Sequence, residues 1–419
     1  MSDQVQFGIA NYSKDSYIVV EGNRRSECFF IIQQGKVQIS REITVEDDKA
    51  EVLVPGDFFG VASAMSSLSP IDTAIALTDV VLIAVRPQQY VPLIQRNPQI
   101  ATKILMQLSI RLRFLNEALA KLTMKNTEAA AGETPARLFD VGEYYFKQKQ
   151  FKQAFYAHTK YLKYCPKDKN RAAATNRLEG LAARVKGVKT EYGKDELNRA
   201  YNKDDMIFAA GEPGDEFFVL QTGSVRISKI VENKEVLLAT LKEGDIFGEM
   251  AILEGKPRTA SAIAGENCSV MAVSKSNFEV LIKGQPQLIG KLTTLLSNRI
   301  WSTFKHLEVI HITNPLGRIY GALLIQLEKS RVNLESKGGH VFTFTWDDVI
   351  HMLGLSEKGG FILMGELHKD KNIQVKNGRI HALSIHEVVR QAELYRKIDE
   401  RGKTVQENRH RSTPISQGF

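Results

Sequence analysis

An internal repeat constrains the fold of this chain more than any other feature of its sequence. The segment Lys14–Gly22 returns as Lys203–Gly211, and Pro55–Gly60 returns as Glu243–Gly248. Both copies contain short runs of alternating apolar and polar residues that end at glycines, a pattern typical of the strands of a β-roll. The chain is therefore expected to hold two copies of one β domain, with the second beginning near residue 195.

One segment of the second copy gathers groups that suit a phosphate and a sugar. Residues 247–264 read FGEMAILEGKPRTASAIA. Gly248 allows close approach of the backbone, and the short helix expected after it would direct the positive end of its dipole at an anion. Arg258 offers a planar fork for two phosphate oxygens, and Thr259 adds a hydroxyl donor. Glu249 can only accept hydrogen bonds, so it suits a ribose hydroxyl. The segment predicts a site for a small nucleotide.

This segment resembles the phosphate-binding cassette of cyclic-nucleotide-binding domains, in which FGE is followed by a few apolar residues and then PR(T/S)A. The β-roll signature of that family, GEPGD, stands upstream at residues 211–215. The resemblance implies that Arg258 pairs with the cyclic phosphate and that Glu249 accepts from the ribose 2′-OH. The structural alternative is that Arg258 only pairs with Glu249 or Glu254 and closes a loop. The ligand would be cAMP or cGMP, and its expected contacts are Gly248, Glu249, Met250, Ala251, Arg258, Thr259 and Ala260.

The first copy departs from this pattern at the positions that would carry the chemistry. Gly60 is followed by Val61 where the second copy has Glu249, and valine cannot accept from a ribose hydroxyl. Asp72, if it takes the place of Arg258, would repel a phosphate. The first copy is therefore expected to have lost the site and to serve as a packing or dimerisation partner. A different ligand remains the alternative.

A long helical pattern follows each copy. Apolar residues recur at steps of three and four, which is typical of a heptad-like seam. In Crp-type regulators this helix forms the dimer axis and caps the base, so the resemblance implies a homodimer with Thr303 as the base contact, Thr293 or Thr294 being weaker candidates. The alternative is a helix packed on its own roll. The seam residues are Ile289, Leu292, Leu296, Ile300, Thr303, Leu307 and Ile310 after the second copy, and Ile104, Leu108, Leu112, Leu115, Leu119 and Leu122 after the first.

Residues 130–190 predict a helical insert between the two copies. The stretch Ala129–Pro135 is typical of a linker and helix start. A single helix pair cannot cover its own apolar face, so the pair should pack on a neighbouring element or on the helix expected around Ala172–Val185. The insert is either a docking surface for a protein partner or a spacer between the copies. The tetratricopeptide-like spacing involves Leu138, Gly142, Tyr145, Ala154 and Pro166.

The C-terminal module, residues 313–390, resembles the winged-helix domain of the Crp/Fnr family. Helices expected over Val349–Leu353 and Glu357–Lys369 flank a short turn, as in a helix-turn-helix, and Ile373–Ile380 predicts a hairpin wing. The candidate DNA contacts are Ser356, Lys358, Lys369, Lys376 and Arg379. However, Gly359 to Ile362 replaces the side chains that usually read bases with groups that carry no hydrogen-bond code. A winged helix that contacts protein, or that reads DNA through its shape, remains the alternative.

Composition agrees with a soluble regulator. The 419 residues exceed the size of one core, and the net charge of +8 permits nucleic acid binding without establishing it. Three widely spaced cysteines indicate a reducing compartment, so a cytoplasmic location is expected. The sequence predicts no membrane span, no cofactor, no metal site and no enzymatic centre, because it lacks the corresponding motifs.

Together these patterns predict an α+β multidomain protein with two jelly-roll-like β-rolls. The function expected is a cyclic-nucleotide receptor that regulates transcription, with one competent and one degenerate site. The alternative is a nucleotide-responsive interaction protein or scaffold that does not read DNA specifically. The expected boundaries are residues 1–125 for the degenerate domain, 130–190 for the insert, 195–312 for the competent domain, 313–390 for the winged helix and 391–419 for a disordered polar tail.

Overall fold

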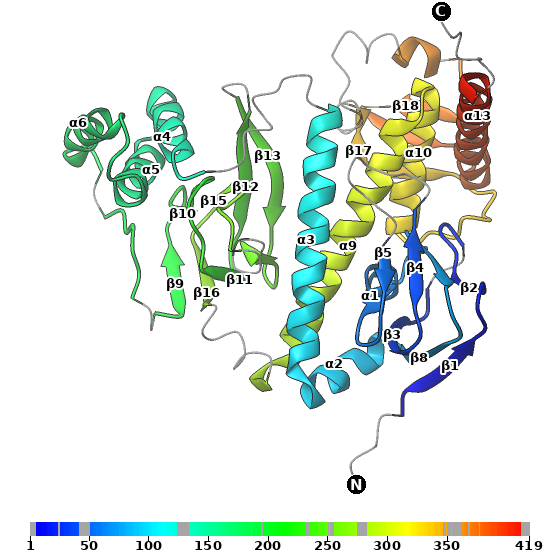
Figure 1. Ribbon diagram of the computed structural model, residues 1–419. Helices are drawn as coiled ribbons and strands as arrows, with labels where there is room; N and C mark the ends of the chain where they lie inside the picture. The colour runs from blue at the N-terminus through cyan, green and yellow to red at the C-terminus, as the bar shows by residue number, and fades with distance from the viewer. Residues whose placement is uncertain are drawn as a thin grey trace, which may run out of the picture. The chain divides into compact units, whose positions relative to one another are not determined.

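The computed structural model (Figure 1) divides into two compact units. Unit 1 comprises Met1–Pro87, Phe114–Thr127 and Ser297–Phe419, and unit 2 comprises Gln88–Arg113 and Glu128–Leu296. One β-roll lies in each unit. The structure describes residues 6–411 except 24–25, 42–50, 124–133, 186, 194–195, 232–233, 250, 252–254, 275–282, 347–348, 350–352, 354–362, 368 and 377.

The first roll, in unit 1, is a sandwich of two antiparallel four-stranded sheets. Along β4 (Val37–Ser40), Val37 and Ile39 are buried while Gln38 and Ser40 are partly exposed, because successive side chains of a strand point to opposite faces. A short helix, α1 (Val61–Ser66), follows β6 (Phe58–Phe59). The strand orders are β1 (Gly8–Tyr12), β8 (Val80–Val85), β3 (Phe29–Gln34), β6 (Phe58–Phe59), and β2 (Tyr17–Val19), β7 (Thr73–Ala76), β4 (Val37–Ser40), β5 (Glu51–Leu53).

The second roll, in unit 2, repeats this architecture. Its core lies between the sheets and includes the stacked rings of Phe208, Phe218 and Phe247. The two β-sandwich domains predicted from the internal repeat are thus confirmed. The strand orders are β14 (Ile246–Phe247), β11 (Glu216–Thr222), β16 (Cys268–Ser274), β9 (Asn198–Tyr201), and β10 (Met206–Phe208), β15 (Ser261–Ala264), β12 (Val225–Val231), β13 (Lys234–Leu241).

The two copies share their strand register. Val37 of β4 lies opposite Ala76, and Val225 of β12 lies opposite Ala264. In the first roll, the N–H of Asp15 donates to the carbonyl oxygen of Ala76. In the second roll, the N–H of the equivalent aspartate donates to the carbonyl oxygen of Ala264. Residues of the two rolls can therefore be paired through their hydrogen bonds.

Long helices follow each roll: α2 (Pro87–Arg96) and α3 (Pro98–Thr123) after the first, and α9 (Pro286–His311) after the second. Most apolar residues of both helical patterns are buried within the single chain, whereas Leu122 near the end of α3 is exposed. On α9 the buried residues include Ile289, Leu292, Leu296, Ile300 and Leu307, and on α3 they include Ile104, Leu108, Leu112 and Leu115.

Within each unit, α9 contacts the helices of the first copy. In unit 2, the Thr293 hydroxyl on α9 lies 3.0 Å from the Tyr90 hydroxyl on α2. In unit 1, the Thr303 hydroxyl on α9 lies 3.5 Å from the Asn116 amide oxygen on α3. The helix of the second copy therefore pairs with elements of its own chain.

Residues between the rolls form α4 (Arg137–Lys147), α5 (Phe151–Tyr164) and α6 (Arg171–Ala182). Figure 1 shows them grouped beside β10 of the second roll, within unit 2. Their apolar side chains share one core with residues of that roll, including Met206 and Ile263. The apolar face of the helix pair is thus covered both by α6 and by the roll.

The C-terminal part of unit 1 begins with α10 (Pro315–Lys329). The Asn314 side chain caps α10 by accepting from the N–H groups of Leu316 and Gly317, and Pro315 occupies the first turn. A three-stranded sheet follows, with order β17 (His340–Thr345), β19 (Arg379–Ala382), β18 (Ile373–Lys376).

The last helix, α13 (Ile385–Arg411), corrects the expectation of a disordered tail from residue 391. Its first half is anchored, because Val388 and Ala392 are buried and the Asp399 carboxylate accepts from the Thr313 N–H at 3.0 Å. The polar composition predicted disorder because these few anchoring residues are spread thinly along the helix.

Candidate functional site

The loop after β14 begins with a glycine in the left-handed region. Gly248 has a φ of 77°, where a side chain would be strained. A Cβ at this position would also lie 2.7 Å from Nη1 of Arg258. Glu249 and Ala251 follow in helical conformation and are each 2% exposed. Met250 lies outside the described residues, so its expected contact is not tested.

Arg258 points into the second roll rather than to solvent. Its side chain is 5% exposed, and its guanidinium lies 4.3 Å from the centre of the Phe208 ring. Nη1 donates to the carbonyl oxygen of Gly248 at 2.5 Å, and Nη2 donates to that of Glu216 at 2.6 Å. Burial lowers the pKa of Arg258, although nearby carboxylates, Glu212 foremost, oppose that shift.

Within the described residues, which do not include Glu254, no carboxylate contacts this guanidinium directly. Nε of Arg258 is buried and has no hydrogen-bond partner. Among the described residues, no carboxylate lies within ion-pair distance of Arg258, and the two acceptors it meets are neutral carbonyl groups. A buried cation of this kind is costly unless an anion compensates it. The surroundings of Arg258 therefore suit an anionic ligand.

The main chain of the segment after β10 holds Arg258 in place. The N–H of Gly211 donates to the carbonyl oxygen of Arg258, and the N–H of Arg258 donates to the carbonyl oxygen of Glu212, both at 2.8 Å. Space for the side chain comes from Gly214, where a Cβ would lie 2.5 Å from Cζ of Arg258. The GEPGD signature thus holds the main chain of Arg258 and leaves room for its side chain.

The remaining residues of the expected set lie beside Arg258 in the sequence. Thr259 is half-buried, and Ala260 is buried just before β15. The structure therefore brings Gly248, Glu249, Ala251, Arg258, Thr259 and Ala260 together in unit 2. Thr303, the expected base contact, belongs to unit 1 and lies against Asn116.

The first roll carries a different residue at the position of Arg258. The N–H of Gly22 donates to the carbonyl oxygen of Pro70 at 2.9 Å, as the N–H of Gly211 does to Arg258. The Thr73 hydroxyl accepts from the N–H of Glu21, as the Ser261 hydroxyl of the second roll accepts from that of Ala210. Pro70 therefore stands in the place of Arg258.

This register corrects the sequence expectation for Asp72. The sequence alignment matched the prolines of the two loops, but the step from Gly60 to Pro70 has the same length as that from Gly248 to Arg258. Asp72 instead lies two residues further on and forms an ion pair with Arg41, which sequence reasoning did not single out. The acid of the first loop is thus engaged within its own roll.

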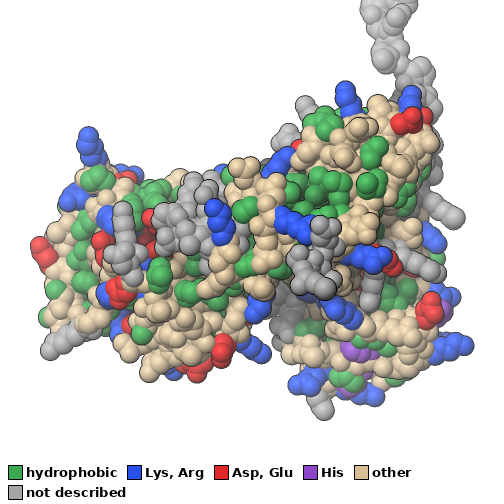
Figure 2. All heavy atoms as spheres, turned by 90° about the horizontal axis from the view of Figure 1, so that it is seen from below, with side chains coloured by type: hydrophobic (Ala, Val, Ile, Leu, Met, Phe, Trp, Pro, Cys, Tyr) green, Lys and Arg blue, Asp and Glu red, His purple; other side chains and the backbone are tan. Residues whose placement is uncertain are grey.

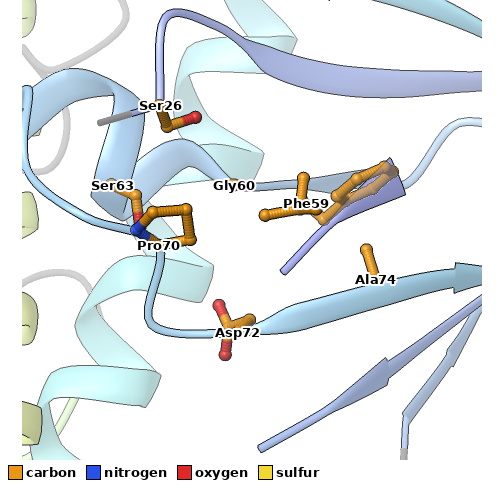
Figure 3. A pocket seen from close by; sticks show the side chains of 8 residues that line it. Ser26, Phe59, Gly60, Ser63, Pro70, Asp72 and Ala74 are labelled. Atoms are coloured by element: carbon orange, nitrogen blue, oxygen red, sulfur yellow. The ribbon is translucent and has the colours of Figure 1, made fainter. Parts of the chain in front are cut away.

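A small cavity marks the corresponding place in the first roll (Figure 3). Its volume is about 10 Å³, which accommodates a single water molecule. The side chains of Ser63, Pro70 and Asp72 border this space, and none of the lining residues is a cation. The cavity is lined by Val19, Ser26, Phe59, Gly60, Ser63, Pro70, Asp72 and Ala74.

Three of the candidate DNA contacts are described and all three are exposed: Lys369, Lys376 and Arg379. Lys376 and Arg379 lie directly opposite each other on β18 and β19. Ser356 and Lys358 lie outside the described residues. On the face shown in Figure 2, Lys and Arg side chains are dispersed among acidic and apolar ones rather than gathered into one patch.

Sequence reasoning missed one set of contacts at the site. Tyr156 and Lys160 of α5 reach the carboxylate of Glu212, the residue whose main chain holds Arg258. The sequence separation between α5 and the GEPGD signature gave no signal of this contact. In the part of the chain that the structure describes, there is no cluster of metal-ligating side chains and no helix able to cross a membrane.

Comparison with known proteins agrees with this geometry. The cyclic nucleotide-binding domain family matches residues 9–97 and 198–285. The chain is 30% identical over 127 residues to the "Cyclic AMP receptor protein" of Thermus thermophilus, covering 30% of this chain and 59% of that protein. It is 28% identical over 161 residues to a "CRP-like cAMP-activated global transcriptional regulator" of Mycobacterium tuberculosis, covering 38% of this chain and 71% of that protein.

Solved structures give weaker likenesses. A CRP/FNR-family transcriptional regulator from Thermus thermophilus matches with 22% identity and a TM-score of 0.32, covering 47% of this chain and 98% of that one. A cAMP-bound structure titled PfPKA-R matches with 19% identity and a TM-score of 0.22, covering 84% of this chain and 83% of that one. Since both TM-scores lie below 0.5, neither likeness says more about this chain. The two stretches that the family matches, residues 9–97 and 198–285, together make up less than half of this chain, and each coincides with one of its two β-sandwiches.

Proposed function

We propose that this chain is a cyclic-nucleotide receptor that regulates transcription, and that the second roll carries its working site. The single observation that carries the proposal is the buried Arg258 guanidinium: among the described residues its two acceptors are neutral carbonyl groups, and its Nε has no hydrogen-bond partner. A cyclic phosphate would supply the missing negative charge through a charge-assisted, bidentate contact. Glu249, buried beside it, is proposed to accept from the ribose 2′-OH.

Titration calorimetry of the full chain with cAMP and with cGMP tests this assignment. Arg258→Ala removes the anion partner and should weaken binding by about 100-fold, because losing one half of a buried charge pair costs ~3 kcal/mol or more. Arg258→Lys keeps the charge but loses the planar fork, so an intermediate loss is expected. No binding by the wild-type chain, or equal affinity in the alanine variant, would refute the proposal.

The first roll is proposed to bind no cyclic nucleotide. Pro70 offers neither charge nor N–H donor at the position of Arg258. Asp72, the acid bordering the cavity, is already paired with Arg41. A structural role for this roll follows, since its following helices pack against α9 in the same chain.

The packing of α9 against helices of its own chain also bears on whether two chains form a homodimer. The apolar seam residues of α9 are buried within one chain, and in unit 1 Thr303 of α9 meets Asn116 of α3. We therefore infer that α3 occupies the place that a partner's helix would take. Any homodimer would then use another surface. Light scattering at micromolar concentration should report the mass of one chain, 47.0 kDa, and a dimer that dissociates on mutation of Leu296 to Glu would contradict the inference.

The transcriptional part of the proposal rests on the C-terminal part of unit 1 and on the relatives named above. Lys376 and Arg379 place two cations opposite each other on one hairpin, an arrangement that is unfavourable unless a polyanion approaches. A mobility shift on genomic fragments, with and without cAMP, tests it. Retardation that depends on cAMP is expected. No retardation even at low salt would favour the alternative, a nucleotide-responsive interaction protein that uses the tetratricopeptide-like insert as its docking surface.

A further inference from the structure

The helical insert reaches the nucleotide site through two side chains of α5. Tyr156 and Lys160 are 3% and 7% exposed, and both point at Glu212 of the second roll. Lys160 Nζ lies 3.0 Å from Oε1 of Glu212, and the Tyr156 hydroxyl lies 3.2 Å from Oε2. The carboxylate also accepts from the N–H of Ala209 at 3.1 Å. The insert therefore binds a carboxylate of the neighbouring domain in a buried setting.

Glu212 joins the insert to Arg258. Its side chain is held by α5, while its main-chain carbonyl oxygen accepts from the N–H of Arg258 at 2.8 Å. The preceding residue, Gly211, returns the bond to the carbonyl oxygen of Arg258. A displacement of the Glu212 main chain would therefore move the arginine backbone with it.

The insert is also docked on the second roll by contacts that do not involve Glu212. Helices α4 and α5 share an apolar core with the second roll, including Met206, Ala209 and Ile263. Around this core, Lys152 pairs with Asp205 at 2.8 Å, and Gln153 donates to the carbonyl oxygen of Asp204. These contacts lie on the same helix as the Glu212 contacts but do not involve Glu212.

A buried ion pair attaches this helix to the roll at a large cost in desolvation free energy. The side chains of Lys160 and Glu212 are 9% and 8% exposed, so both charges have lost most of their water. Such a pair contributes little net stability compared with apolar residues of similar volume. Burial and the nearby Glu212 carboxylate also raise the pKa of Tyr156, so this hydroxyl stays protonated and remains a donor.

We propose that Tyr156 and Lys160 are positioning residues of the cyclic-nucleotide site, and that docking of the insert and occupancy of the site are coupled through Glu212. The inference rests on the proposed function of Arg258. When a phosphate makes a bidentate contact, the guanidinium must give up at least one of its bonds to the carbonyl groups of Gly248 and Glu216, and this exchange would shift the loop that Glu212 holds. Coupling between two binding events is reciprocal, so a partner that loosens α5 would weaken nucleotide binding by the same factor.

The test compares three variants of the full chain by calorimetry with cAMP. Lys160→Met should weaken binding by about tenfold, within the usual range of coupling energies. Tyr156→Phe removes one hydroxyl and should weaken binding by a smaller factor. Lys152→Met is the matched control, because it removes an ion pair between the same helix and the same roll without touching Glu212. It should bind cAMP within about twofold of wild type.

Hydrogen exchange of α5 supplies the readout that a merely structural role would not move. In the wild-type chain, adding cAMP should change the protection of the α5 amides, and this change should be absent in Arg258→Ala. If Lys160→Met does not fold, Tyr156→Phe decides the matter on both measurements. If the wild-type chain binds neither cAMP nor cGMP, the proposed function itself is refuted. A different outcome would overturn only the coupling. In it, the wild-type chain binds cAMP tightly, Arg258→Ala abolishes binding, and the affinity is unchanged in Lys160→Met, Tyr156→Phe and Lys152→Met.

Discussion

Pro70 and Arg258 occupy the same backbone position in the two rolls, because the carbonyl oxygen of each accepts the N–H of the equivalent glycine, Gly22 or Gly211. The two copies thus keep one scaffold and differ in the side chain at its centre. An arginine has been exchanged for a residue without charge or donor, and the nearby acid of the first roll is paired with Arg41.

The replacement of the arginine by Pro70 in the first roll predicts how many nucleotide molecules bind to one chain. We expect one cyclic nucleotide to bind per chain, because Arg258 supplies a phosphate partner and Pro70 does not. Calorimetry with concentrated protein measures the number of sites directly. Two sites of comparable affinity, with one surviving in Arg258→Ala, would show that the first roll binds by other means.

A methyl group at Gly214 should expel the arginine from its position. The Cβ of Gly214→Ala would lie 2.5 Å from Cζ of Arg258, so the guanidinium must move. We expect a loss of about tenfold in cAMP affinity and ~1–3 kcal/mol in the free energy of unfolding.

Gly180→Ala on α6 is the control for that variant, since nothing lies within 4 Å of its added Cβ. In a helix this change should leave stability unchanged or raise it by ~1 kcal/mol. Equal cAMP affinities in the two alanine variants would mean that the space beside Gly214 is not needed by Arg258.

The insert should lose stability in mild acid because of His158. Burial lowers the pKa of His158 from 6.5 to about 4, although Glu143, 3.4 Å away, opposes the shift and Arg177 adds to it. Below pH 6.5 the unfolded chain binds a proton that the folded chain does not. The contribution of His158 to the free energy of unfolding is therefore complete above pH 6.5 and is lost as the pH falls toward about 4.

Thermal unfolding between pH 7.5 and 4.5 measures this effect. The pKa of Glu143 is lowered, chiefly by its hydrogen bonds from Arg177, so its own contribution is lost mainly below its unfolded value of 4.5. The window above pH 4.5 therefore reports His158 more than Glu143. In His158→Phe the dependence on pH should flatten, and an unchanged slope in that variant would assign the acid sensitivity elsewhere.

The hairpin cations should contribute to DNA affinity without setting its sequence preference. Replacing both Lys376 and Arg379 with Gln removes two phosphate contacts, so the slope of log affinity against log salt should fall by ~2. Binding to specific and non-specific fragments should weaken by a similar factor. Lys337→Gln, an exposed residue of the same unit outside the hairpin, serves as the control. Unaltered salt dependence in the double variant would remove the hairpin from the DNA interface.

The rolls were predictable from the sequence because their determinants are local. Glycines and alternating apolar residues fix strands and turns, and FGE with PRTA fixes the loop around Arg258. The register of the first loop was not predictable, since two prolines can be matched in sequence while the hydrogen bond of Gly22 decides which residue replaces the arginine. Contacts such as that of Lys160 with Glu212 join distant segments and leave no periodic signal. The α13 helix was missed because its few anchors are outnumbered by charged residues.

The two carbonyl groups that hold the Arg258 guanidinium also bear on which anions this protein would ignore. The carbonyl oxygens of Gly248 and Glu216 accept from the two Nη groups, which are also donors that a phosphate would use. Free inorganic phosphate would have to compete with these carbonyl groups without the sugar and base contacts that a nucleotide brings. We therefore expect the proposed site not to bind inorganic phosphate at cellular concentrations and to bind only a ligand that contacts several of its residues at once.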